Sequence, residues 1–403
     1  MSAKIITFGC RLNTFESAAI GQKLEQCDRN IVVVNTCAVT GEAERQCRQA
    51  IRKARREHPD AFLVVTGCAA QVHPELYAKM PEVDRVLGNR EKLDPAAFAP
   101  QSPDLAVSDI DAPAGFESVE PVSFDGRCRA FIQIQQGCDN HCTFCIIPQA
   151  RGKSVYLGAD KILHYARVLV DKGFCEIGLT GVDITDYPEF AGLVAGLTKV
   201  DGLKRLRLGS LDPACVRGDL IALFGETDVL QPHLHLSAQA GDDLVLKRMA
   251  RRHTREDIIR LCERVRAVRP DVVFGADFIA GFPTETEAMF RNTLDLVETA
   301  NITHLHVFPY SERSGTPAAK KPQVPVQTRK ERAARLREKG ESLLFDYMRG
   351  KMGQTAVVLC ETERKGLCEH YLPVRLDRDC AAGQIVRARL TGMRDGVFEG
   401  SVL

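Results

Sequence analysis

The sequence of 403 residues predicts an α/β protein with three parts: an N-terminal parallel α/β domain, a central partial (β/α)6 barrel and a small C-terminal β-barrel. Three observations lead to this fold class. Short apolar runs alternate with helical patterns up to residue 95, six further strand–helix repeats follow residue 125, and short strand patterns split by turn residues begin near residue 350. The length independently indicates two or three domains of about 100–200 residues each.

The composition limits the functions that the whole chain can have. The 54 basic and 53 acidic residues give a net charge of +1, so any contact with a polyanion has to be local. No segment approaches the ~18 apolar residues of a membrane span, and MSAKIITFGC lacks the apolar region of a signal peptide, so we expect a cytoplasmic protein without a membrane partner. In that compartment the 15 cysteines should occur as metal ligands or buried thiols rather than disulfides.

The N-terminal domain is predicted over residues 1–95. Its strand-like runs are KIITFGC, NIVVVNTC, AFLVVTGC and DRVLG, and GEAERQCRQAIRKARREH is its clearest helix. Three of the strands end in a cysteine, at Cys10, Cys37 and Cys68, and the carboxyl ends of neighbouring parallel strands meet at one edge of a sheet. One such cysteine is most often a small buried hydrophobe. Three at the same topological position favour a shared metal site.

A linker rich in Pro, Ala, Ser and acidic residues is predicted over residues 96–124, and the barrel domain over residues 125–345. The barrel strands are expected in RAFIQIQ, EIGLTGVDI, RLRLGSL, PHLHLSAQ, VVFGADFIAGFP and THLHVFPYS. Barrel active sites lie at the carboxyl ends of such strands. The side chains and glycines expected there are Asp183, Ser210, Asp212, Ser237, Gln239, Gly281, Tyr310 and Ser311.

The loop after the first barrel strand, GCDNHCTFC, holds Cys138, Cys142 and Cys145 within nine residues. Three thiolates this close can belong to a zinc site, a disulfide framework or an iron–sulfur cluster. Structural zinc prefers four protein ligands, and only His141 is an obvious fourth. An iron–sulfur cube on three cysteines leaves one iron open. The spacing of the three cysteines therefore favours an iron–sulfur cluster over a zinc ion. Their position at the mouth of a barrel favours it further.

Beyond the barrel, a helix with basic excess from Arg329 to Lys339 leads to the β-rich residues 350–403. A solvated helix face is the ordinary explanation for the helix, although a basic helix also suits a phosphate backbone. The β-rich part contains TAVVLCE, HYLPVRL, QIVRARLTG and VFEGSVL, and its charge is nearly balanced.

The CxxxCxxC motif, with aromatic Phe144 before its last cysteine, resembles the defining motif of radical S-adenosylmethionine enzymes. The resemblance implies a [4Fe–4S] cluster on Cys138, Cys142 and Cys145, whose open iron is chelated by S-adenosylmethionine and whose electron generates a 5′-deoxyadenosyl radical. It also implies that the cofactor rests on the strand ends, near Phe144, Gly181, Asp183, Ser237, Gln239 and Gly281.

The resemblance narrows to the methylthiotransferase family. GCRLNTFES, NTCAVT and TGCAAQ look like the motifs of its N-terminal domain, and LHLSAQAG, LKRMARRHT, FIAGFPTETE and FPYSERSGTP look like its later barrel motifs. The family implies a second [4Fe–4S] cluster on Cys10, Cys37 and Cys68 that handles sulfur, so that all six cysteines serve catalysis. Residues 350–403 resemble the RNA-binding TRAM barrel, which implies tRNA as a partner through its anticodon stem-loop, besides an electron donor such as flavodoxin or ferredoxin.

Among the branches of the family, GCRLN followed by ES, with LTGVDIT, is most similar to the enzymes that methylthiolate threonylcarbamoyladenosine beside the tRNA anticodon. The sister branches modify isopentenyladenosine in tRNA or an aspartate of a ribosomal protein. Outside the enzymes, the alternative is a zinc-containing RNA-binding protein.

Overall fold

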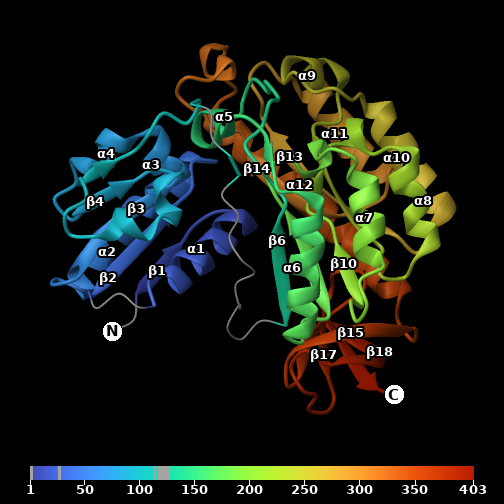
Figure 1. The fold of residues 1–403 in the computed structure, drawn as a ribbon. Helices are drawn as coiled ribbons and strands as arrows, with labels where there is room; N and C mark the ends of the chain where they lie inside the picture. The colour runs from blue at the N-terminus through green and yellow to red at the C-terminus, as the bar shows by residue number, and fades with distance from the viewer. Residues whose placement is uncertain (1–2, 26–28, 113–114, 117–127) are drawn as a thin grey trace.

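The computed structural model describes residues 3–25, 29–112, 115–116 and 128–403. Figure 1 shows the N-terminal domain beside the central barrel and a small β-barrel at one end of it. The N-terminal sheet is entirely parallel and runs in the order β1-β2-β3-β4-β5. Its strands are β1 (Lys4–Thr7), β2 (Ile31–Thr36), β3 (Phe62–Gly67), β4 (Arg85–Leu87) and β5 (Leu105–Ala106). The helices of this domain are α1 (Arg11–Lys23), α2 (Gly41–Glu57), α3 (Cys68–Val72) and α4 (Pro74–Ala78).

The local sequence explains these elements. Every residue of β2, IVVVNT, is buried, as expected for a parallel strand covered on both faces. Helix α2 begins after Thr40, whose hydroxyl accepts a hydrogen bond from the Ala43 amide at 3.1 Å. Its buried residues recur every three or four positions and face the sheet: Glu44, Cys47, Ile51 and Ala54.

The predicted linker covers residues 96–124, and a strand in its first half belongs to the N-terminal sheet. Strand β5 pairs with β4 through Val86 with Leu105 and Leu87 with Ala106. A strand of two residues has no periodicity, so the sequence did not reveal it. Residues 113–114 and 117–124 of the predicted linker lie outside the described part of the chain.

The central domain is an open half-barrel of parallel strands. Its two sheets run β10-β9-β6 and β11-β12-β13-β14, and β10 and β11 are consecutive pieces of the run RLRLGSL. The strands are β6 (Arg129–Gln133), β9 (Glu176–Thr180), β10 (Arg205–Arg207), β11 (Ser210–Leu211), β12 (His233–Gln239), β13 (Val273–Ala280) and β14 (Ile302–Pro309). The principal helices are α6 (Ala159–Asp171), α7 (Phe190–Thr198), α8 (Gly218–Glu226), α10 (Arg255–Val268), α11 (Glu287–Thr299) and α12 (Val326–Gly350). This arrangement confirms the predicted partial (β/α)6 barrel.

The barrel strands have two different faces. In β12, Leu234, Leu236 and Ala238 are completely buried in the core beneath the helices. The alternate residues are less buried and face the inside of the half-barrel, here called the concave face: His233, His235, Ser237 and Gln239 of β12, Asp277 of β13 and His304 and His306 of β14. The concave face is therefore polar, although the strands themselves are held by an apolar core.

The remaining short elements of this domain lie near the carboxyl ends of the strands. They are the hairpin β7 (Gln135–Gln136) with β8 (Val155–Tyr156), helix α5 (Ile147–Arg151) and helix α9 (Asp243–Arg248). Ile146 and Ala150 beside and within α5 join the apolar core of the N-terminal sheet, so α5 ties the two domains together.

The C-terminal module is a closed barrel in the order β15-β16-β17-β19-β18. Its strands are β15 (Thr355–Thr362), β16 (Lys365–Cys368), β17 (Pro373–Leu376), β18 (Ile385–Arg394) and β19 (Val397–Val402). It packs against the amino ends of the central strands, where Arg205 donates to the carbonyls of Val357 at 2.6 Å and Leu367 at 3.1 Å. In Figure 1 it lies at the end of the half-barrel away from α5.

Helix α12 contains the basic stretch from Arg329 to Lys339, but much of its charge is already paired. Arg329 and Arg332 are buried, and the ion pairs are Arg329 with Glu312, Arg332 with Glu285, Arg335 with Glu287 and Lys339 with Glu298. The expectation of a solvated basic face is therefore wrong for the buried Arg329 and Arg332, whereas Arg335 and Lys339 are accessible to solvent but ion-paired. Their charges attach α12 to the barrel.

A search of the described residues finds no helix with the length and apolar character that crossing a membrane requires.

Candidate active site

The loop that carries Cys138, Cys142 and Cys145 lies between β7 and α5. It is fixed by backbone hydrogen bonds from the Cys138 amide to the Gly152 carbonyl at 3.0 Å and from the Thr143 amide to the Met249 carbonyl at 3.1 Å. Gly137 has a φ of +74°, and a Cβ there would lie 1.9 Å from the Lys153 carbonyl oxygen, so only glycine fits at the start of the loop. Burial, together with the neighbouring Cys142 and Cys138, raises the pKa of the Cys145 thiol to about 12.

The other three cysteines follow adjacent parallel strands, as the sequence predicted. Cys10 precedes α1, Cys37 follows β2 and Cys68 begins α3. Burial raises the pKa of the Cys37 thiol to about 12, and Cys68 and Cys10 are both close enough to contribute to the shift. A Cβ on Gly9 would lie 2.8 Å from the Cys37 sulfur, so the small residue before Cys10 allows the two segments to approach.

The spacing of the sulfurs bears on what these two triads can hold. Neither triad is among the groups of the described residues whose ligand atoms all lie within 4.8 Å of one another. A tetrahedral zinc with Zn–S bonds of about 2.3 Å needs sulfurs about 3.8 Å apart. Cysteines that bind different irons of a cube stay farther apart. At least one pair of sulfurs in each triad therefore lies farther apart than a single tetrahedral zinc ion requires.

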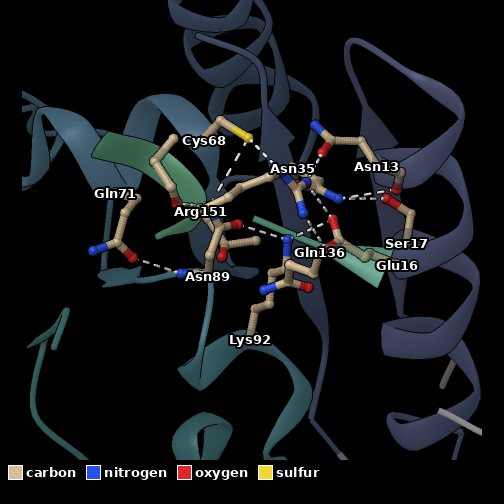
Figure 2. A network of polar contacts seen from close by, with 12 residues as sticks. Asn13, Glu16, Ser17, Asn35, Cys68, Gln71, Asn89, Lys92, Gln136 and Arg151 are labelled. Atoms are coloured by element: carbon tan, nitrogen blue, oxygen red, sulfur yellow. Dashed lines mark hydrogen bonds and ion pairs between the residues drawn. The ribbon is translucent and has the colours of Figure 1, made fainter. Parts of the chain in front are cut away.

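Arg151, the last residue of α5, connects the segment that follows the three-cysteine loop to Cys68 and α1 through a buried polar network, shown in Figure 2. Its Nε donates to the Cys68 sulfur at 3.2 Å. Its Nη1 and Nη2 donate to the two carboxylate oxygens of Glu16 at 2.8 and 2.9 Å, and Nη2 also donates to Asn13 Oδ1 at 2.7 Å. The Lys92 ammonium lies 2.6 Å from the Glu16 Oε2 oxygen. The charged side chains of Arg151, Glu16 and Lys92 are each at most 1% exposed.

The charges of this network determine its protonation. Burial opposes ionisation of Glu16, but Arg151 and Lys92 outweigh it and lower the pKa of Glu16 from 4.5 to about 2. Burial also opposes the charge on Arg151, yet Cys68, Glu16 and Cys10 raise its pKa well above the ordinary value. Arg151 therefore stays charged close to two of the three strand-end thiols.

A cavity of about 250 Å³ lies between the two cysteine-bearing segments. Cys145 and Phe144 line it from the barrel loop, Val39 and Thr40 line it from the segment after Cys37, and Gln239 lines it from the end of β12. The other lining residues are Ile146, Ile147, Asp277, Ile279, Phe308, Pro309, Tyr310 and Ser311. This mostly apolar space, with a few polar groups, has the character of a small-ligand site.

The residues expected to hold the cofactor fall into two groups. Phe144 and Gln239 line the cavity. Asp183 accepts a hydrogen bond from Asn140 of the cysteine loop at 2.8 Å, and burial raises its pKa. Gly181 packs against Gln135, because a Cβ there would lie 2.9 Å from its carbonyl oxygen.

Like Asp183 and Gly181, the other two expected residues do not line the cavity. Ser237 shares a hydrogen bond of 2.8 Å with Ser210 on the concave face. Gly281 lies against Arg329, since a Cβ there would be 2.6 Å from its Cγ, and its amide donates to Glu285. The structure thus gives Gly281 a packing role beside α12.

The structure also places side chains near the site that the sequence analysis did not identify as candidates. Arg251 donates to the Cys142 sulfur at 3.3 Å and to the Ser237 carbonyl at 3.0 Å. Asp277 lies 3.1 Å from His235 and 3.3 Å from His306, and hydrogen bonds from these histidines lower its pKa against the effect of burial. The alternating histidines of PHLHLS and THLHV were the available signal, because residues two apart in a strand share a face.

Comparison with known proteins identifies the same family that the sequence motifs resemble. Residues 132–297 match the family model described as the radical SAM superfamily, and residues 2–88 match the one described as uncharacterized protein family UPF0004. The threonylcarbamoyladenosine tRNA methylthiotransferase MtaB of Rickettsia prowazekii (strain Madrid E) is 47% identical, covering 98% of this chain and 96% of that protein. This chain belongs to the radical S-adenosylmethionine methylthiotransferase family. As a radical S-adenosylmethionine enzyme, it uses a [4Fe–4S] cluster and S-adenosylmethionine.

Other members and solved structures are more distant. The tRNA-2-methylthio-N(6)-dimethylallyladenosine synthase of Ruegeria pomeroyi (strain ATCC 700808 / DSM 15171 / DSS-3) is 35% identical over 96% of this chain and 95% of that protein. The radical S-adenosylmethionine methyltransferase TsrM from Kitasatospora setae has a similar fold, with a TM-score of 0.54 and 16% identity over 77% of this chain and 67% of that chain. At that identity the likeness concerns the fold alone.

The buried network predicts a pH-dependent contribution to stability. Replacing Glu16 with Gln leaves Arg151 and Lys92 buried without a countercharge, and should lower the free energy of unfolding at pH 7 by about 3–5 kcal/mol. Because the pKa of Glu16 falls from 4.5 to about 2 on folding, the ion pairs stabilise fully above pH 4.5 and progressively less toward pH 2. Thermal denaturation between pH 7 and pH 2 should show the gap between wild type and Glu16→Gln narrowing below pH 4.5.

The matched control is Glu42→Gln, which breaks the exposed pair between Glu42 and Arg45 on α2 and should change stability little. A Glu16→Gln protein with wild-type stability at pH 7 would contradict the role given to the network.

Proposed function

We propose that this protein adds a methylthio group to the adenine ring of threonylcarbamoyladenosine next to the anticodon of tRNA. In this proposal Cys138, Cys142 and Cys145 hold one [4Fe–4S] cluster and the three strand-end cysteines, Cys10, Cys37 and Cys68, hold a second. The observation that carries the proposal is the cavity with Cys145 on one side and the segment after Cys37 on the other. A substrate held there would lie against Cys145 and against Val39 and Thr40, which follow Cys37 in the chain.

The ligand sets suit this chemistry. Three thiolates satisfy three irons of a cube and leave the fourth able to bind another molecule. When bound, the clusters and S-adenosylmethionine supply a radical strong enough to remove hydrogen from a ring carbon, together with sulfur and a methyl group. An electron donor such as flavodoxin or ferredoxin would provide the reducing electron.

The protein's own side chains prepare the site. Arg251 donates a hydrogen bond to the Cys142 sulfur and Arg151 donates one to the Cys68 sulfur, so a guanidinium lies at one sulfur of each triad. Phe144 and Ile279 give the cavity apolar walls, and Val39 and Thr40 cover it from the N-terminal domain. These walls keep water away from a reactive intermediate.

The choice of substrate branch is supported by the relatives. The Rickettsia prowazekii relative named for threonylcarbamoyladenosine is 47% identical, whereas the Ruegeria pomeroyi relative named for dimethylallyladenosine is 35% identical, each over nearly the whole chain. Modification of the dimethylallyl nucleoside is therefore the alternative function, and the experiment has to distinguish it from modification of threonylcarbamoyladenosine.

Nucleoside mass spectrometry tests the function directly. In tRNA from cells that lack the protein, threonylcarbamoyladenosine should lose its methylthio form while the dimethylallyl nucleoside keeps its own, because each nucleoside needs its own enzyme. Re-expression of the chain should restore the product. Loss of the dimethylallyl product alone would move the protein to the other branch, and a colourless protein with stoichiometric zinc would contradict the enzyme altogether.

The two triads should give different defects when each is replaced with alanine. Without Cys138, Cys142 and Cys145, cleavage of S-adenosylmethionine to 5′-deoxyadenosine should stop, because its iron is lost with the ligands. Without Cys10, Cys37 and Cys68, some cleavage should continue but no methylthio product should form. Anaerobically prepared wild type should contain about eight irons, and each triple variant about four.

Product formation by the variant lacking Cys10, Cys37 and Cys68 would remove the second cluster from the mechanism. A useful control is Cys262→Ala, since Cys262 lies buried in α10 and should leave the iron content unchanged.

We further propose that residues 350–403 bind the tRNA. A target adenine has to leave the anticodon-loop stack, which costs a few kcal/mol that contacts with the surrounding RNA can offset. Basic side chains are exposed on the outer surface of the C-terminal barrel and are without an ion pair among the described residues: Lys365, Arg375, Arg387 and Arg389. The ion-paired charges of α12 contribute less.

Reversing Arg387 and Arg389 to Glu should weaken tRNA binding in a salt-dependent manner. Loss of two phosphate contacts should reduce the slope of log K against log salt concentration by about one to two. The melting temperature should stay as in wild type because both side chains are exposed. The control reverses Arg260 and Arg264, two exposed residues of α10. Equal tRNA affinity in both variants would assign the module to stability instead.

A further inference from the structure

Tyr371 of the C-terminal module reaches the inside of the half-barrel and closes one end of the concave face. The residue has a φ of +64°, and its ring stacks on His233 with centroids 5.2 Å apart. From His233 the concave face continues to His304 at 5.2 Å between ring centroids. It continues past His235 and His306 to Asp277, which lines the cavity beside Cys145. A polar strip therefore connects Tyr371 with the cavity.

Three arginines surround Tyr371. The guanidinium carbons of Arg11, Arg129 and Arg207 lie 5.4, 5.7 and 4.9 Å from its ring centre. The Tyr371 hydroxyl accepts hydrogen bonds from Arg11 at 2.9 Å and from Arg129 at 3.3 Å. This concentration of positive charge lies at the foot of the concave face.

The three arginines differ in how their charges are neutralised. Arg129 pairs with Glu361 at 2.6 Å, and Arg207 pairs with Glu176 at 3.1 Å. Within the described residues, Arg11 is exposed and pairs with no carboxylate, and its polar contact is the Tyr371 hydroxyl. Burial lowers the pKa of His233, and it lowers that of His304 to about 4, so both imidazoles are neutral at pH 7. Arg11 thus carries the uncompensated charge.

Arg11 also directly follows Cys10, so the same short segment reaches one cysteine triad and the foot of the concave face. The carbon that receives sulfur must approach that triad. With that carbon toward the triad, the substituent on N6, at another corner of the adenine ring, would point away from the triad, and the concave face is the polar surface that could receive it. The two branches differ in this substituent: threonylcarbamoyl ends in a carboxylate, and dimethylallyl is apolar and uncharged.

We propose that Arg11, supported by the Tyr371 hydroxyl, binds the carboxylate of the threonylcarbamoyl group and thereby selects the substrate. The inference rests on the proposed function, whose substrate class it explains. A guanidinium forms paired, charge-assisted hydrogen bonds with a carboxylate. With an apolar substituent at that place, Arg11 would lose contact with water and gain no partner, which is how a polar site rejects an analogue.

The test compares Arg11→Gln with wild type on anticodon stem-loops that contain threonylcarbamoyladenosine. The variant should raise KM for methylthio product about ten- to a hundredfold, with a smaller change in kcat, because a charged hydrogen bond in binding is lost. Arg11→Lys keeps the positive charge but lacks the paired N–H donors of a guanidinium, so its KM should lie between those of wild type and Arg11→Gln. Arg56→Gln, an exposed arginine of α2, should leave KM unchanged.

A second measurement uses wild type alone and so does not depend on the folding of any variant. A stem-loop whose threonylcarbamoyl carboxylate is converted to the methyl ester should bind about tenfold or more weakly than the acid. The iron content of Arg11→Gln, measured beside it, separates a lost substrate contact from damage to the neighbouring Cys10.

The outcomes distinguish this inference from the proposed function. If wild type modifies the threonylcarbamoyl stem-loop, but acid and ester bind equally and Arg11→Gln keeps its KM, the inference is overturned and the function stands. If wild type modifies only the dimethylallyl stem-loop, both are overturned.

Discussion

The arrangement of the whole site depends on the buried ion pair between Arg151 and Glu16. Arg151 ends the short helix after the three-cysteine loop, and Glu16 lies on the helix that begins after Cys10. The pair therefore fixes the distance between two cysteine-bearing segments of different domains. Breaking a buried pair leaves an unpaired charge, which is far more costly than losing an exposed one. That cost holds the domains in one relative position, which the proposed use of both triads in one reaction requires.

The half-barrel separates two physical environments with one set of strands. One side of each strand packs in the apolar core beneath the helices, as Leu234 and Leu236 do. The other side presents histidines, serines and Asp277 to the concave face. Because successive residues of a strand alternate between faces, the same sequence supplies stability on one face and a polar surface on the other. The C-terminal module contributes to both, since it packs on the strand ends and sends Tyr371 into the concave face.

Much of the fold followed from local sequence patterns. The alternation of apolar runs and helical segments predicted the parallel N-terminal sheet and the partial barrel, and short strands between turn residues predicted the C-terminal barrel. These local patterns did not predict contacts between residues that are far apart in the sequence. Strand β5 has two residues and was taken for linker, and the basic face of α12 was expected in solvent although Arg332 is buried against Glu285. In both cases the partner is distant in the sequence.

For the candidate site, the sequence by itself indicated six cysteines as candidate ligands, because their positions after strands and within one loop follow from spacing and topology. It could not determine what joins them. Arg151 and Glu16 are 135 residues apart, and Arg11 and Tyr371 are 360 residues apart. Neither contact produces a periodic or local signal. Only the packing of the N-terminal domain and the C-terminal module around the half-barrel brings these side chains within hydrogen-bond distance, because such contacts depend on the positions of whole elements.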